Sequence, residues 1–324
     1  MEMRSLGSTG QPISVLGYGA WVTGSDTATA SLDGSSLTRA IRTALDQGIT
    51  VIDTAEIYAR GRSEEIVGRA VRPVRDDVFL VTKVAPDGAG SGMRPEDIGP
   101  ALRASLARLG TDHVDLYLLH WHDPTVPIED TWGAMAALAD AGLARFVGVS
   151  NFGEDLVDRC LRIAPVHAVE NQLSLLHPDD ADLAAGLSAR GIAFLAYGAL
   201  AFGLLSGRIT PDTILDPSDW RSGGFARYES NYYEELFAPD RLERHHAFAR
   251  QLAVIAAENG VPPAVLALRW TLELPGVTAA IIGTTNADHL RQNARAGSLG
   301  LDDRTRSRIE DLLARERTEA RRTM

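Results

Sequence analysis

Eight short apolar runs recur along this chain, and a segment with helical periodicity lies between most of them. Such runs suit strands that are buried on both faces of a parallel sheet. The runs are Val15–Ala20, Thr50–Asp53, Val78–Lys83, Val114–His120, Phe146–Ser150, Ala168–Gln172, Ala193–Tyr197 and Thr278–Gly283. Strand and helix that alternate in this way predict a (β/α)8 barrel rather than a doubly wound sheet.

The glycines near the first run do not favour the alternative fold. A doubly wound dinucleotide-binding domain would be expected to carry G-x-G-x-x-G early in the chain. Residues 17–22 read GYGAWV and fail that motif at the last position. The barrel is therefore the preferred interpretation.

Two further segments complete the expected fold. The stretch from Met3 to Ile13 contains a turn-forming Ser-Thr-Gly and is expected to form a hairpin. The connection from Phe202 to Asp240 is too long for an ordinary loop, and such loops in compact domains are usually functional. We expect residues 1–324 to form a single α/β domain, a (β/α)8 TIM barrel with an N-terminal hairpin and a long loop before the last βα units.

The composition limits the function classes. With 324 residues, 45% of them hydrophobic and 23% charged, the chain is expected to be a soluble globular protein. Its net charge of −11 argues against a nucleic-acid surface. No signal peptide is recognisable and no apolar run approaches the ~20 residues of a membrane span, so a cytoplasmic location is the default expectation. The single cysteine, Cys160, cannot form an internal disulfide, and no cysteine/histidine cluster has metal-site spacing.

Polar residues gather at the ends of the predicted strands. Barrels of this kind build their active sites where the strands end. The residues at these ends are Asp53, Lys83, His120, Ser150, Asn151, Asn171, Gln172, Tyr197 and Gly283. An ionised Asp53 at the end of a buried strand needs a partner, because an unpaired buried charge is costly. We expect that partner to lie among the other strand-end residues.

Lys83 is the leading candidate for that partner. It is the only lysine of the chain, so the other 31 of the 32 basic residues are arginines. A lysine is a compact charge that can lie beside a phenol and stabilise its phenolate, and Tyr58 stands five positions after Asp53. A purely structural Lys83–Asp53 pair and a Tyr58 packed under a loop stay open as alternatives.

Of the histidines considered, only His120 is a candidate catalytic residue. His120 could be a catalytic residue or a hydrogen-bonded filler at a strand end. His122 could suggest a metal pair with His120, but no third ligand stands nearby, so no metal is expected. His245 and His246 lie in a polar helical stretch and are not expected to be catalytic.

These motifs resemble the catalytic tetrad of the aldo-keto reductase superfamily. The tetrad would consist of Asp53, Tyr58, Lys83 and His120. The resemblance continues through residues 148–152, 170–172, 197–207 and 282–286, nearly from end to end of the chain. The segment 283–293 is especially similar to the branch that contains the potassium-channel β-subunits.

The resemblance implies that an NADP(H) molecule lies extended across the barrel mouth. Ser150, Asn151 and Gln172 would hold its carboxamide, and Tyr197 would stack on the nicotinamide. The loop 200–208 would cover the pyrophosphate, and the helix that begins near Asn286 would offer free N–H groups to a phosphate. The implied cofactor residues are Trp21, Asp53, Ser150, Asn151, Gln172, Tyr197, Gly198, Ala199, Leu200, Ala201, Gly203, Leu204, Arg208, Gly283, Thr284, Thr285, Asn286, His289, Gln292 and Asn293.

The sequence departs from the family pattern in two places. Gly198 and Ala199 stand where the family commonly has Ser-Pro, and Thr285 and Asn286 stand where many relatives carry a basic residue for the 2′-phosphate. In the channel-subunit branch a hydroxyl stands at the position of Thr285, and NADP(H) still binds with help from basic residues of the long loop. The candidates for that help here are Arg208, Arg221 and Arg227. We therefore expect NADP(H) rather than NAD(H).

The implied reaction is reversible reduction of an aldehyde or ketone to the alcohol. An ordinary tyrosine, with a pKa of about 10, is a poor acid near neutrality. Lys83, balanced by Asp53, would favour the phenolate of Tyr58 and so make it usable as the proton donor, while His120 would orient the carbonyl.

The substrate is the least determined part. Trp21, Tyr58, His120 and Trp121 are expected to line a pocket for an apolar, ring-shaped or sugar-like carbonyl compound, with core packing as the alternative for either tryptophan. The competing function is an NADP(H)-binding regulatory or partner protein with little catalysis. The channel β-subunits lack the histidine that stands here at position 120. The oligomeric state is left open by the sequence.

Overall fold

The strands of the chain close into a parallel barrel, as the alternating sequence pattern predicts. The structure is a computed structural model and describes residues 1–21, 34–86, 92–215, 219, 221 and 236–323. Around the barrel the strands run in the order β10-β3-β4-β5-β6-β7-β8-β9. Their bounds are β3 Leu16–Gly19, β4 Val51–Asp53, β5 Phe79–Val84, β6 Val114–Leu119, β7 Ala144–Ser150, β8 Ala168–Gln172, β9 Ala193–Tyr197 and β10 Val277–Ile282. Each predicted run corresponds to one of these strands, so the (β/α)8 prediction is confirmed.

Alternate residues of each strand point into the barrel, because the side-chain period of a strand is two. The interior is filled by a separate apolar cluster, distinct from the larger core between the strands and the helices. Its members are Leu6, Ile13, Val51, Phe79, Val81, Leu116, Leu118, Ala168, Ala193, Leu195, Ala279 and Ile281. The next inward positions along β4, β5 and β8 carry Asp53, Lys83 and Glu170. An apolar plug therefore lies directly beneath a polar mouth.

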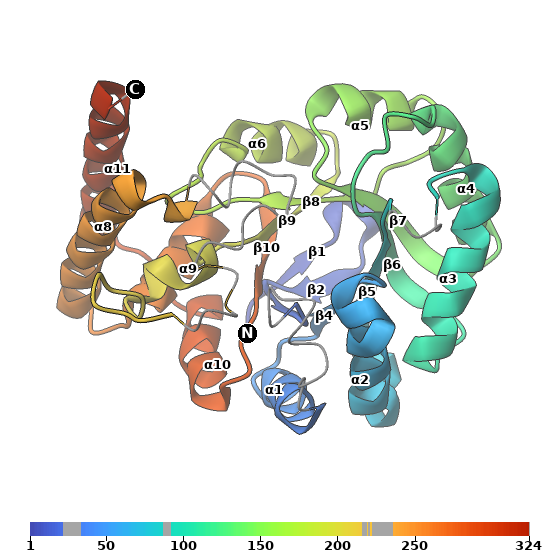
Figure 1. The fold of residues 1–324 in the computed structure, drawn as a ribbon, viewed down its shortest axis with the longest axis horizontal. Coiled ribbons are helices and arrows are strands. Elements are labelled where there is room, and N and C mark those ends of the chain that lie inside the picture. Colours follow the sequence, from blue (N-terminus) through green and yellow to red (C-terminus); the bar gives the residue numbers. More distant parts are fainter. Residues whose placement is uncertain (22–33, 87–91, 216–218, 220, 222–235, 324) are drawn as a thin grey trace.

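The N-terminal hairpin closes the opposite end of the barrel. It consists of β1 Met3–Ser5 and β2 Pro12–Ser14, which pair in antiparallel fashion, and it lies at the centre of the ring of strands in Figure 1. Leu6 and Ile13 of the hairpin segment are fully buried against the interior cluster. The mouth formed by the C-terminal strand ends is thus the end that the hairpin leaves uncovered.

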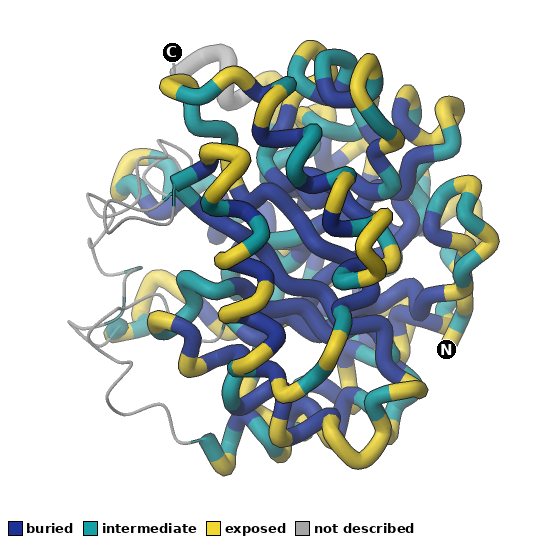
Figure 2. Tube along the Cα trace, turned by 90° about the vertical axis from the view of Figure 1, so that its right-hand side faces the viewer, coloured by how far each residue is buried: buried dark blue, intermediate teal, exposed yellow. Residues whose placement is uncertain are grey.

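Amphipathic helices surround the strands and bury their apolar faces against them (Figures 1 and 2). Pro95 begins α3, and Pro100 lies within its first turns. The C-terminal helix α11 packs on α8, where Arg244 donates to Glu316 over 2.6 Å. The helices are α1 Gly34–Asp46, α2 Arg62–Val71, α3 Pro95–Leu109, α4 Ile128–Asp140, α5 Glu154–Leu161, α6 Ala181–Ala189, α8 Pro239–Glu258, α9 Pro263–Glu273, α10 Ala287–Asn293 and α11 Asp303–Thr323.

Hydropathy identifies no single membrane-spanning helix among the described residues. Only α8 and α9 taken together reach the required length and apolar character, and they are bent by 92° relative to each other.

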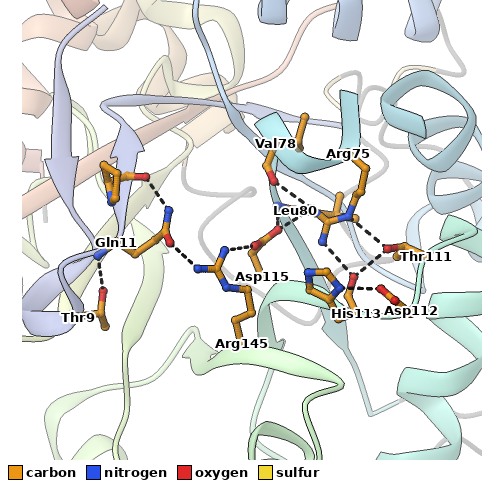
Figure 3. A network of polar contacts seen from close by, with 11 residues as sticks. Thr9, Gln11, Arg75, Val78, Leu80, Thr111, Asp112, His113, Asp115 and Arg145 are labelled. Carbon is orange, nitrogen blue, oxygen red and sulfur yellow. Dashed lines mark hydrogen bonds and ion pairs between the residues drawn. The ribbon is translucent and has the colours of Figure 1, made fainter. Parts of the chain in front are cut away.

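A buried carboxylate ties together the N-terminal ends of three strands (Figure 3). Asp115 of β6 is 2% exposed. It accepts from Arg75 and from the backbone N–H of Leu80, each over 2.9 Å, and from Arg145 over 2.9 Å. Arg145 also donates to Gln11, which precedes β2, over 2.7 Å. This network lies at the hairpin end and joins β5, β6, β7 and the hairpin.

We expect Asp115→Ala to lower the free energy of unfolding by about 3 kcal/mol, because it leaves Arg75 largely buried without its carboxylate. Arg145→Ala is the matched control. Its side chain is 48% exposed, so its loss should cost about 1 kcal/mol or less. Denaturant unfolding of both variants measures the difference, and equal losses would contradict this account of Asp115.

Candidate active site

Asp53 and Lys83 meet at the mouth because they lie on adjacent strands. Asp53 ends β4 and is paired in register with Val81 of β5, so Lys83 stands one inward position nearer the mouth. The Lys83 ammonium donates to Asp53 Oδ1 and, over 3.2 Å, to the carbonyl of Thr54. The Lys83 side chain is 0% exposed. The sole lysine of the chain is therefore fully buried and paired with Asp53.

The loop after β4 holds Tyr58 beside Lys83. The N–H groups of Thr54 and Glu56 donate to the carbonyls of Val81 and Lys83 over 3.0 Å and 3.3 Å. The Glu56 carboxylate accepts from the N–H of Ala85 over 3.1 Å. These bonds tie the loop to the end of β5 and place the Tyr58 ring centroid 5.4 Å from the Lys83 ammonium.

His120 follows β6 and lies against the same tyrosine. The ring centroids of His120 and Tyr58 are 5.7 Å apart, and Trp121 stacks on His120 at 3.7 Å. His120 is 5% exposed, and burial, together with the charge of Lys83, holds its pKa well below the usual range. Its Nδ1 has no hydrogen-bond partner within the described residues. His120 is thus a neutral imidazole with an unused ring nitrogen.

The charges at the mouth stabilise the ammonium. Burial alone would lower the pKa of Lys83, but the neighbouring Asp53, Glu170 and Tyr58 outweigh it and raise that pKa above its ordinary value. Burial raises the pKa of Asp53, and the charge of Lys83 opposes that rise. Lys83 therefore stays protonated throughout the physiological range.

Glu170 is a member of this cluster that sequence reasoning missed as a site residue. Its Oε1 lies 3.3 Å from the Lys83 ammonium, and its side chain is 4% exposed. Glu170 belongs to β8, which is not a neighbour of β5 in the barrel. The sequence did hold one signal for it. Glu170 stands two positions before Gln172 on the same strand, so both side chains point into the barrel.

The four residues expected to hold a nicotinamide lie at the ends of β7, β8 and β9. Ser150 and Gln172 are buried, and Asn151 is half-buried. Gln172 Nε2 is a buried donor that lacks a partner in the described part of the chain. Asn151 accepts from the hydroxyl of Tyr197 over 2.6 Å and donates to the carbonyl of His120 over 2.9 Å. Asn151 thus also braces Tyr197 and the His120 backbone, a role that the sequence did not predict.

The loop after β9 lies against Trp21, which follows the barrel strand β3. It contains the short helix η5, Ala201–Ser206, in which Gly203 has φ +108°. Phe202 packs edge-on against Trp21 with ring centroids 5.8 Å apart. Three of the expected cofactor residues, Ala199, Ala201 and Leu204, bury their side chains in the outer core. They can therefore offer only backbone groups to a ligand.

The basic residues expected near this loop differ in their surroundings. Arg208 is exposed. Burial is the main cause that lowers the pKa of His289, and the charge of Arg208 lowers it further. Arg221 is paired with Asp219 and donates to the carbonyl of Phe202 over 3.1 Å. Arg227 lies outside the described residues. Arg208 therefore contributes positive charge in the region of His289.

The start of α10 does not match the expectation of free N–H groups. The Asn286 side chain caps the helix and accepts from the N–H groups of Asp288 and His289 over 2.8 Å and 3.2 Å. The N–H of Asn286 itself donates to the Thr284 hydroxyl over 3.1 Å. That prediction was wrong for these amides, because a good N-cap residue satisfies them first. Gly283, Thr285 and Gln292 are exposed along the same segment, whereas Asn293 is buried.

The remaining histidines stay outside this cluster. His122 lies with its ring 6.1 Å from Phe152, and His245 and His246 are buried in α8. His245 Nδ1–H donates to the carbonyl of Leu236 over 2.8 Å, which gives it a structural contact. No group of three or more metal-ligating side chains occurs in the described ranges.

The chain belongs to the aldo/keto reductase family, whose model matches residues 15–314. It is 35% identical to the aldo-keto reductase YhdN of Bacillus subtilis, over 90% of this chain and 87% of the relative. It is also 31% identical to a probable voltage-gated potassium channel subunit beta of Oryza sativa, over 91% of each chain. The resemblance inferred from the motifs is confirmed, including the branch.

Solved structures agree with this assignment. The glycerol dehydrogenase AKR11B4 from Gluconobacter oxydans superposes with a TM-score of 0.83 at 28% identity, over 97% of this chain and 95% of the other. An aldo-keto reductase from Klebsiella pneumoniae in complex with NADPH gives a TM-score of 0.73 at 29% identity, over 97% and 96% of the two chains. The family is one of NADP(H)-using oxidoreductases, as the sequence indicated.

Gly198 stands where the family commonly has serine, and its backbone lies in the left-handed region that favours glycine. Its φ is +67°, and an added Cβ would lie 3.2 Å from Gln172 Nε2. We expect Gly198→Ala to lower the free energy of unfolding by about 2 kcal/mol, half from the left-handed φ and half from displacement of Gln172.

Gly142→Ala is the control for the backbone contribution. Gly142 has φ +73° with no atom within 4 Å of an added Cβ, so its substitution should cost only about 1 kcal/mol. Denaturant unfolding compares the two. Equal losses would show that the contact with Gln172 contributes nothing.

Proposed function

We propose that this protein is an NADP(H)-dependent carbonyl reductase that reduces an aldehyde or ketone to the alcohol, reversibly, with Tyr58 as the proton donor. The observation that carries the proposal is the buried contact of Lys83 with Asp53 beside Tyr58. Burial of an ion pair costs desolvation free energy, and well-packed hydrophobic side chains would stabilise the core at least as well. A buried Lys83–Asp53 pair is therefore better explained by a chemical role than by stability alone.

The residues at the mouth fit a nicotinamide. A carboxamide would satisfy the buried donor Gln172 Nε2, which lacks a partner among the described groups, and Ser150 would complete the recognition. The ring of Tyr197, held by Asn151, offers a flat surface for stacking. The cofactor would supply the hydride equivalent for the reduction, and the chain supplies its position and the proton.

Tyr58 moves the proton. Its hydroxyl donates to the oxygen that becomes the alcohol, and the phenolate left behind is stabilised by the Lys83 ammonium 5.4 Å from the ring centroid. Asp53 fixes the ammonium in place through a direct contact. In the reverse direction the same phenolate accepts the proton of the alcohol.

His120 orients the carbonyl. A neutral imidazole carries one N–H and can donate it to a carbonyl oxygen without adding a charge to a buried site. The stacked Trp121 fixes the plane of the His120 ring at an interplanar angle of 17°. His120 and Tyr58 would therefore contact the same oxygen from two sides.

The substrate would meet aromatic walls. Trp121 is 40% exposed at the mouth, and Trp21 is half-buried beside Phe202. Such walls suit a ring-shaped or apolar carbonyl compound. Because a solved neighbour is a glycerol dehydrogenase, a panel of carbonyl substrates should include glyceraldehyde beside aromatic aldehydes and keto-sugars.

The similarity to plant channel β-subunits favours one alternative, an NADP(H)-binding partner protein with little turnover. The presence of His120 in contact with Tyr58 supports the enzyme instead. The decrease of NADPH absorbance with the carbonyl panel separates the two, since a partner protein would bind NADPH without consuming it.

We expect Tyr58→Phe to lower turnover at least about a hundredfold, because it removes the hydroxyl that donates the proton. NADPH affinity, measured by fluorescence titration, should stay within about twofold, since the ring that stacks on the cofactor is that of Tyr197. Near-normal turnover of any reactive aldehyde by this variant would remove Tyr58 from the role of acid.

We expect Arg208→Ala to weaken NADPH binding about tenfold and NADH binding hardly at all, because a guanidinium pairs well with the 2′-phosphate that only NADPH carries. Arg190→Ala is the control. Arg190 pairs with Asp158 over 2.5 Å at the far end of α6, so its loss removes a charge without touching the site. Equal weakening of both cofactors by Arg208→Ala would refute the assignment.

A further inference from the structure

The buried Lys83 ammonium faces two carboxyl groups instead of one. Asp53 approaches it from the neighbouring strand β4, and Glu170 approaches from β8, with Oε1 at 3.3 Å. The side chains of all three are at most 4% exposed. Glu170 thus reaches the lysine across the interior of the barrel rather than along a shared edge.

The charges of these three groups do not balance if all are ionised. One ammonium and two carboxylates would leave a net charge of −1 in a site closed to water, which is costly. Two buried carboxyls that share one cation relieve this cost when one of them keeps its proton. The geometry therefore requires a proton on Asp53 or Glu170 around neutral pH.

The contacts assign that proton to Glu170. Asp53 makes the direct bond to the ammonium, whereas the nearer Glu170 oxygen stands 3.3 Å away. Glu170 Oε2 is buried and has no hydrogen-bond partner among the described residues. An ionised carboxylate would leave its negatively charged Oε2 without a hydrogen-bond donor. A protonated carboxyl is neutral and avoids that cost.

The surroundings of Glu170 act in the same direction. Burial, and then the negative charge of Asp53, raise the pKa of Glu170 to about 8 against an opposing effect of Lys83. The other titratable groups that face this region are Tyr58, His120 and Tyr197. The described strands β3, β7 and β10 present Gly19, Ser150 and Ile281 inward there and so add no charge.

We propose that Glu170 is a positioning residue that acts through Lys83. While its carboxyl keeps the proton, the ammonium is balanced by Asp53 alone and can stabilise the phenolate of Tyr58. When Glu170 loses its proton, the cluster carries an extra negative charge, and formation of a second anion at Tyr58 is opposed. The proposal rests on the proposed role of Tyr58, and it makes Glu170 the group that limits alcohol oxidation on the alkaline side.

Glu170→Gln tests the proposal, because an amide keeps the size of the side chain and cannot ionise. The alkaline limb of kcat/KM for alcohol oxidation, which reports loss of the Glu170 proton, should move to higher pH by at least about one unit, because the amide cannot acquire the negative charge that opposes the phenolate. Glu170→Asp, which restores an ionisable group, should return the limb toward that of the wild type. A limb that does not move in Glu170→Gln would overturn the proposal.

Glu64→Gln is the matched control. Glu64 is also a fully buried glutamate, but it lies in α2 and accepts from Thr82 and Arg108 on the outer side of the barrel. Its substitution should change stability without moving the pH profile. A shift equal to that of Glu170→Gln would show that any buried glutamate has the effect, and would overturn the assignment to Glu170.

Thermal unfolding against pH tests the proton without any turnover. The folded protein holds a proton on Glu170 that the unfolded chain releases at the ordinary value of 4.5, so the stabilising contribution is complete below that pH. It is lost progressively as the pH rises to about 8. The melting temperature of the wild type should therefore fall relative to that of Glu170→Gln over this window and then run parallel to it.

A constant difference between the two melting curves would overturn the proposal even if the enzyme reduces carbonyls normally. Conversely, a pH-dependent difference in a protein that consumes no NADPH would contradict only the proposed function. Should Glu170→Gln fail to fold, infrared spectroscopy of the wild type gives the same answer. A protonated-carboxyl C=O band must disappear around pH 8, and its absence at neutral pH would overturn the proposal.

Discussion

The burial of one ammonium group organises the whole C-terminal end of this barrel. Lys83 is fully buried, and an unpaired charge in that position would cost several kcal/mol. Asp53, the Thr54 carbonyl and Glu170 surround it from two sides of the barrel. The loop that carries Tyr58 is held by bonds to the same strand as the lysine. The position of the proposed proton donor therefore depends on how the lysine is accommodated.

The sequence predicted the barrel and the Asp53–Lys83 contact because both depend on local rules. Which strand residues point inward, and where each strand ends, can be counted along the chain. Asp53 and Lys83 belong to consecutive strands, which pair in the barrel. Tyr58 could be placed for the same reason, since it follows one of these strands by a few residues. The motif resemblance added the roles of these residues, which parity alone could not supply.

The features that sequence reasoning missed depend on distances between non-adjacent elements. Glu170 meets Lys83 across the barrel interior, and nothing in the spacing of β5 and β8 indicates that separation. The N-cap role of Asn286 was missed because a sequence does not show whether a side chain or a ligand satisfies the first amides of a helix. The Asp115 network at the other end likewise joins residues from four elements.

The backbone itself distinguishes the two ends of the barrel. The five non-glycine residues with positive φ among the described residues lie in loops that follow β4, β7 and β9, and they are Ala59, Arg60, Asn151, Ala201 and Phe202. At the hairpin end, turns that lead from helix to strand use glycine for the same φ, as at Gly110 and Gly142.

A left-handed conformation costs a non-glycine residue about 1–2 kcal/mol, so it persists only where surrounding contacts enforce it. Asn151 shows such enforcement, since its side chain is held by Tyr197 and by the His120 carbonyl. Replacement of Asn151 by glycine would relieve the strain but would also remove the side chain that accepts from the Tyr197 hydroxyl and donates to the His120 carbonyl. The strained loops therefore mark the same end of the barrel as the buried charges, by an argument independent of any titratable group.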